Sequence, residues 1–131
     1  MNAQNFTQKS IEAINNAQKL AIEYQNPQVE VEHILLALLD QDNSLVKELI
    51  KKMGVIENFE KDIKRRIENM PRVTGGARPS NGIYVSQDVD IVLQNSENIA
   101  KKMKDEYVSV EHIMLAIIDN VSGELKEIFK K

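Results

Sequence analysis

The chain repeats one pattern of apolar and polar positions. Residues 29–40 read VEVEHILLALLD and residues 108–119 read VSVEHIMLAIID, so the two segments are 79 positions apart. The same offset aligns Thr7 with Ser86 without a gap and gives 11 identities over the 34 positions 7–40. Unrelated sequences of ordinary composition would share about 2. The pattern therefore predicts a duplicated structural unit.

Both copies have apolar residues at helical spacing, as in Ile11, Ile14 and Ala17. Helix-stopping residues such as Pro27 and Pro71 divide the apolar stretches. About seven helices are expected, over residues 7–24, 31–41, 44–53, 58–70, 86–104, 110–120 and 122–130. No strand pattern competes with them. The sequence predicts an all-α fold of two tandem helical repeats related by a pseudo-twofold axis.

A length of 131 residues fits a single domain. Between the repeats, residues 71–82 read PRVTGGARPSNG, and the two prolines and three glycines are typical of a linker. We therefore expect one domain over residues 1–131, organised as repeat one at 6–70, a linker at 71–84 and repeat two at 85–131.

Composition excludes several classes of function. The net charge is −3 and no basic stripe is present, which argues against nucleic-acid binding. The longest apolar run, residues 34–39, is far shorter than the roughly 20 residues of a membrane span. Cysteine is absent and the N-terminus is polar, unlike a secretory signal. We expect a cytoplasmic protein that binds neither nucleic acid nor membrane.

Catalytic motifs are also missing from the sequence. It has no phosphate-binding G-x-x-x-x-G-K-[ST] loop, and Gly75-Gly76 has no strand before it. His33 and His112 share one repeat position, but neither has a second histidine four residues later. We interpret them as hydrogen-bonded helix residues rather than metal ligands. The sequence predicts a binding module that is not an enzyme and holds no metal or cofactor.

The repeated V-x-V-E-H-I-[LM]-L-A segment, the stretch FTQKSIEAINNAQKLA before its first copy and the phrase MPRVTGG between the copies resemble the N-terminal domain of Clp unfoldases. Within that family they look most like the ClpB protein disaggregases. The resemblance covers essentially the whole chain. It implies that the family's final helix is missing after Lys131 and that the ATPase domains are absent.

The resemblance also implies a function. ClpB is a ring-forming AAA+ ATPase, a homohexamer that uses ATP and magnesium to thread aggregated chains through its pore together with the DnaK system. Its N-terminal domain engages unfolded or aggregated polypeptide segments before threading. We expect the same role here, with the isolated domain a monomer.

Site residues follow from the family's motif positions. The resemblance implies substrate handling by Thr7, Asp105 and Glu111, beside an apolar groove at Leu93 and Ile99. Asn95 and His112 stand where some relatives carry leucine, which predicts a more polar groove. Ile91, on a polar helix face, is a further candidate for an exposed apolar contact.

Each site residue also has a purely structural interpretation. Thr7 is well placed as a helix N-cap. Glu111 and its counterpart Glu32 lie in the first turn of a helix, where a carboxylate is favoured. Asp105 suits a solvated turn, and the two groove residues suit the core.

Two other functions remain open. The domain could be a receptor for adaptor proteins or phosphoarginine-marked substrates, as in ClpC, where glutamates at the places of Glu32 and Glu111 contact phosphoarginine. That interpretation expects two similar sites, near Thr7/Glu32 and Ser86/Glu111. The other possibility is a structural domain that spaces the ring and binds no peptide.

Overall fold

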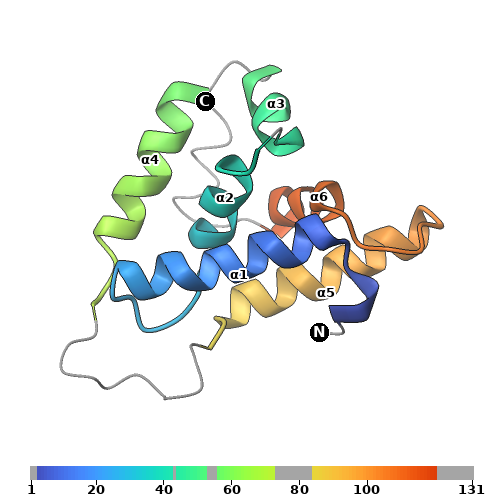
Figure 1. Cartoon of the computed structure of the whole chain (residues 1–131), viewed down its shortest axis with the longest axis horizontal. Helices are drawn as coiled ribbons and strands as arrows, with labels where there is room; N and C mark the ends of the chain where they lie inside the picture. The colour runs from blue at the N-terminus through green and yellow to red at the C-terminus, as the bar shows by residue number, and fades with distance from the viewer. Residues whose placement is uncertain (1–2, 43, 53–55, 73–83, 121–131) are drawn as a thin grey trace.

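The computed structural model describes residues 3–42, 44–52, 56–72 and 84–120. A 3-10 turn, η1 (Ala3–Asn5), precedes six α-helices within these ranges (Figure 1). They are α1 (Gln8–Glu23), α2 (Val31–Leu39), α3 (Leu45–Lys52), α4 (Ile56–Glu68), α5 (Gln87–Lys102) and α6 (Val110–Asn120). The all-helical prediction is confirmed. The expected seventh helix, 122–130, and most of the expected linker lie outside the described residues.

The two halves begin in the same way. Thr7 and Ser86 cap α1 and α5, and their hydroxyl oxygens accept the N–H of Ser10 and of Val89 respectively. Each cap satisfies a backbone donor that the first turn of a helix would otherwise leave without a partner.

The two long helices also end alike. Gln25 and Lys104 adopt φ values of 59° and 61°, in the left-handed region. The following amides, of Asn26 and Asp105, donate to the carbonyls of Ala21 and Ala100, both at 2.9 Å. This is the Schellman arrangement that closes a helix, here with glutamine and lysine where glycine is usual.

Backbone hydrogen bonds connect each half to the other. The Thr7 N–H donates to the carbonyl oxygen of Val108 at 3.0 Å, and the Ser86 N–H donates to that of Val29 at 2.9 Å. The start of α1 therefore lies against the segment that leads into α6, and the start of α5 lies against the segment that leads into α2. This reciprocal pairing is the pseudo-twofold relation that the repeat predicts.

The core is centred on α2, in which every residue is buried. It packs against α1, α4, α3 and α6, whereas α6 packs chiefly on α5 (Figure 1). Although α2 and α6 come from the same repeat segment, α6 leaves Leu115 and Ile118 exposed. In the described part of the chain, no helix covers α6 in the way that α4 covers α2.

Candidate binding site

Each histidine joins the end of one helix to the start of the next. His112 Nδ1 accepts the backbone N–H of Ser109 at 2.9 Å, and His112 Nε2 lies 2.9 Å from Asp105 Oδ2. In the first half, His33 Nδ1 accepts the Glu30 N–H at 2.8 Å, and Nε2 lies 2.8 Å from Asn26 Oδ1. Because Nδ1 accepts in both rings, the neutral ring donates from Nε2. Their prediction as hydrogen-bonded helix histidines is confirmed.

Burial decides the protonation state of His33. Its side chain is completely inside the protein. Burial disfavours the charged ring and lowers the pKa of His33 from 6.5 to about 4. His33 is therefore a neutral structural group at physiological pH, placed at the third position of α2 as the side-chain half of a capping box.

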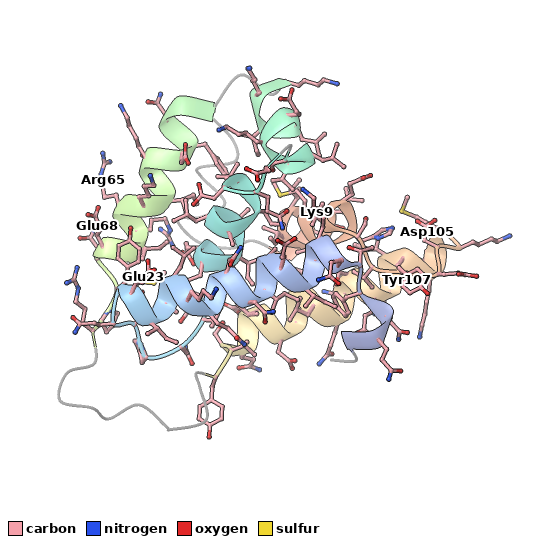
Figure 2. All side chains as sticks on the ribbon, in the orientation of Figure 1. Lys9, Glu23, Arg65, Glu68, Asp105 and Tyr107 are labelled. Carbon is pink, nitrogen blue, oxygen red and sulfur yellow. The ribbon has the colours of Figure 1, made fainter. Side chains whose placement is uncertain are left out.

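Asp105 is more than a solvated turn residue. Its carboxylate accepts from His112 and remains about half exposed. The buried ring thus fixes the position of the carboxylate, which still faces solvent. Figure 2 shows Asp105 and Tyr107 together at the tip of the molecule where α5 ends, with Lys9 of α1 toward the same side.

Asp105 borders a hollow between the end of α5 and the start of α6, here called the α6 hollow. Its volume is about 380 Å³, and its lining residues are Met103, Asp105, Glu106, Tyr107, Ser109, Glu111, His112 and Leu115. The apolar or aromatic members Met103, Tyr107 and Leu115 are exposed. Carboxylates and apolar side chains thus share one open depression, a combination suited to a segment that carries both apolar and cationic groups.

A second depression, the α1 hollow, adjoins the first. It has a volume of about 230 Å³ and is lined by Lys9, Gln41, Ser44, Leu45, Ser109, Val110 and Glu111. Ser109 and Glu111 line both hollows. Lys9 Nζ already donates to the carbonyl oxygen of Asp42 at 2.6 Å. Glu111, which is exposed, therefore stands between an acidic hollow and one that contains a lysine.

The structure brings Thr7, Asp105 and Glu111 to the same end of the molecule, but Leu93 and Ile99 do not join them there. Thr7 is partly buried, and its hydroxyl donates to Ser10 Oγ in addition to capping α1. Leu93 is only 3% exposed and belongs to the core, and Ile99 is half-buried against it. Neither residue lines the two hollows.

The remaining predicted residues are polar or isolated. The side-chain amide of Asn95 donates to Asn120 Oδ1 at 2.9 Å. Ile91 is exposed, as its place on a polar helix face predicts. The sequence analysis missed Met103, Tyr107 and Leu115. Tyr107 could have been noticed, because a tyrosine replaces the Gln28 of the first repeat.

The expected second site differs from the first. Glu32 is buried, and its Oε2 lies 2.9 Å from Arg66 Nε of α4. Ser86 is buried too. The grouping of Thr7 with Glu32 and of Ser86 with Glu111 is wrong. The Thr7 amide bonds to Val108, three residues before Glu111, and the Ser86 amide bonds to Val29, three residues before Glu32.

Two features are absent among the described residues. None of their helices has the length and apolar character to cross a membrane. No group of three or more histidine, aspartate or glutamate side chains among them could hold a metal ion.

Comparison with known proteins decides the family. Residues 5–131 match the profile of the Clp repeat (R) N-terminal domain. The chain belongs to this family. It is 38% identical, over its whole length, to the ClpB chaperone protein of Clostridium perfringens and 40% identical, over 90% of its length, to that of Porphyromonas gingivalis. It spans 15% and 13% of those two proteins and matches their N-terminal regions.

Solved structures agree with this assignment. The Hsp104 N-terminal domain from Candida albicans has a TM-score of 0.79 and 30% identity to the chain, covering 96% of this chain and 80% of that one. A ClpV N-domain solved in complex with a VipB peptide has a TM-score of 0.77 at 24% identity, covering 97% and 78%, and shows the shared fold. The Clp N-terminal domain is a non-catalytic module of AAA+ chaperones.

Proposed function

We propose that this Clp domain binds segments of unfolded or aggregated polypeptides at the two hollows around Glu111. The observation that carries the proposal is the composition of the α6 hollow. Exposed Met103, Tyr107 and Leu115 line this hollow together with three carboxylates, those of Asp105, Glu106 and Glu111. An unfolded segment exposes the apolar and cationic side chains that such a surface can hold.

Physical considerations predict weak binding. Each hollow is open and small, and an unfolded segment loses conformational entropy when it is ordered on a surface. Charge pairs at the exposed rim contribute roughly 0.2–1 kcal/mol each. A weakly bound segment can be released readily, which suits a module that passes its substrate onward.

The proposal extends to a longer protein. In a ClpB chaperone, the bound segment would be delivered to a homohexameric threading ring that uses ATP and magnesium and cooperates with DnaK. Membership of the family and similarity to ClpB proteins support this role. The ClpV N-domain, which has the same fold, was solved with a peptide bound, so this fold has a peptide-binding surface in that protein.

Titration of the isotope-labelled domain with an unfolded model protein tests the proposal by NMR. We expect backbone amide shifts at Asp105, Tyr107 and Glu111, and weaker binding by Glu111→Gln than by the control Asp119→Asn on the same helix. Shifts centred on Leu93 and Ile99 would instead move the site to α5. The absence of any shift at millimolar ligand would refute the proposal.

A second candidate is a receptor for phosphoarginine or for adaptor proteins. Its support is the α1 hollow, where Lys9 and Glu111 supply a cation for the phosphoryl group and a carboxylate for the guanidinium. Arg66 already occupies Glu32, so this candidate implies one open site rather than two. Phosphoarginine should then shift Lys9 and Glu111, whereas arginine amide should not. Equal shifts from both ligands would reject it.

A further inference from the structure

The same buried ring occurs in both halves, but it faces a different partner in each. His33 is 0% exposed and His112 is 4% exposed. Each ring accepts, at Nδ1, the backbone N–H of the residue three positions before it. Each directs Nε2 at the residue seven positions before it, which is Asn26 for His33 and Asp105 for His112. The partner is therefore a neutral amide in the first half and a carboxylate in the second.

Asn26 completes a structural network in the first half. Its side-chain oxygen accepts from His33, and its side-chain amide donates to the carbonyl oxygen of Pro71 at 3.2 Å. A carboxylate has no hydrogen to donate, so Asp105 cannot make a bond equivalent to the one with Pro71. Among the described residues, His112 is the one hydrogen-bond partner of the Asp105 carboxylate. Asp105 thus keeps accepting capacity that Asn26 does not have.

The ring of His112 is a fixed donor. Its Nδ1 accepts the Ser109 N–H at 2.9 Å, and Ser109 Oγ lies 3.1 Å from the same atom. These contacts tie the ring to the first turn of α6, so Nε2 faces Asp105 in one orientation. An aspartate side chain in a turn otherwise exchanges between rotamers. Accepting from a fixed, buried donor restricts this freedom before any ligand arrives.

We propose that His112 is a positioning residue, which holds the Asp105 carboxylate ready for a lysine or arginine side chain of a bound unfolded segment. This inference rests on the proposed function and names the group that prepares one of its contacts. The surroundings suit a cation, because Glu106 and Glu111 line the same hollow and no basic side chain of the described residues does. The ring acts through Asp105 and makes no contact with the segment.

Two peptides test the preference for a cation. One is an unstructured peptide of leucine, lysine, serine and glycine, called here the lysine peptide. The glutamine peptide has glutamine in place of every lysine. In NMR titrations of the labelled wild-type domain, the lysine peptide should shift the Asp105 amide and bind about two- to fivefold more tightly, the range for an exposed ion pair.

Three substitutions separate position from charge. His112→Gln keeps an acceptor for the Ser109 N–H, as in a capping box, but loses the ring that holds Asp105. Asp105→Glu keeps the charge but moves it by one methylene group, whereas Asp105→Asn removes the charge and restores the pair seen at Asn26. All three should weaken the lysine peptide about two- to fivefold and leave the glutamine peptide unchanged.

A matched control and a double variant complete the test. His33→Gln makes the same ring substitution in the first half and should leave the binding of both peptides unchanged. Adding His112→Gln to Asp105→Asn should cause no further loss, because the ring acts only through the carboxylate. Urea unfolding of each variant at neutral pH checks that the titrated protein is folded.

Several outcomes would overturn the inference. Wild-type binding of the lysine peptide by Asp105→Glu or His112→Gln would show that charge suffices without positioning. Equal loss of both peptides in His112→Gln would show a general structural role, and a further loss in the double variant would show direct contact with the ring. If the lysine peptide has no advantage while an unfolded model protein still shifts the hollow, this inference fails alone. If the model protein also gives no shift, the proposed function fails with it.

Discussion

The neutral, buried His33 makes the stability of the domain depend on pH. The pKa of His33 falls from 6.5 in the unfolded chain to about 4 in the folded protein because the ring is buried. Between these values the unfolded state binds more protons than the folded state, so stability is lost as the pH falls. The free energy of unfolding should fall by about 2 kcal/mol by about pH 5. The full loss, reached below about pH 4, is about 3 kcal/mol.

The hydrogen bonds of the ring explain why the charged form is disfavoured. Nδ1 accepts the Glu30 N–H, so a proton on Nδ1 would break this capping bond and leave the amide of Glu30 without its acceptor. Nε2 faces Asn26 Oδ1, which a neutral ring already satisfies by donating its Nε2 hydrogen. Protonation therefore removes one interaction and adds a buried charge.

The assay is urea unfolding at several pH values, comparing the wild-type domain with His33→Gln. Glutamine can accept the same backbone N–H but does not titrate. The stability advantage of the wild type should shrink by about 2 kcal/mol between about pH 7.5 and about pH 5. Burial and the charge of Glu60 raise the pKa of Asp40, although Lys64 and Lys47 act in the opposite direction. A raised carboxyl pKa adds stability as the pH falls. Both proteins contain Asp40, so its contribution cancels in the comparison. Parallel curves for the two proteins would refute the reasoning.

Three other stability predictions follow from the fold, each measured by urea unfolding. Ser86→Ala should cost about 1 kcal/mol because it removes the N-cap of α5; an unchanged midpoint would contradict that role. Gln25→Gly should raise the free energy of unfolding by about 0.5–1 kcal/mol, since glycine adopts φ 59° without strain. As a control, Lys19→Gly inside α1 should lower it by about 0.7 kcal/mol. Phe59→Ala should cost about 3–5 kcal/mol, and a loss below about 1 kcal/mol would show that α4 is not essential to the core.

The sequence alone determined the helical architecture. Helix starts at Thr7 and Ser86 depend on local hydrogen bonds between a side chain and the next turn, so the residue types are sufficient to predict them. The apolar spacing within each helix is equally local. The duplication added a non-local fact, because two similar units can pack by a shared symmetry. Because His33 and His112 share one repeat position, the duplication also indicated that both rings form hydrogen bonds of the same kind.

The binding surface depended on tertiary structure. Glu32 and Glu111 stand in nearly identical local sequence, V-E-V-E-H and V-S-V-E-H, yet one is buried against Arg66 and the other is exposed. Leu93 was expected in a groove and lies in the core, while Leu115 was expected in no site and lines the α6 hollow. Periodicity identifies which face of a helix is apolar, but burial is decided by what packs there. The packing of α4 over α2 is such a case, because it joins two parts of the chain that the local sequence of α2 does not relate.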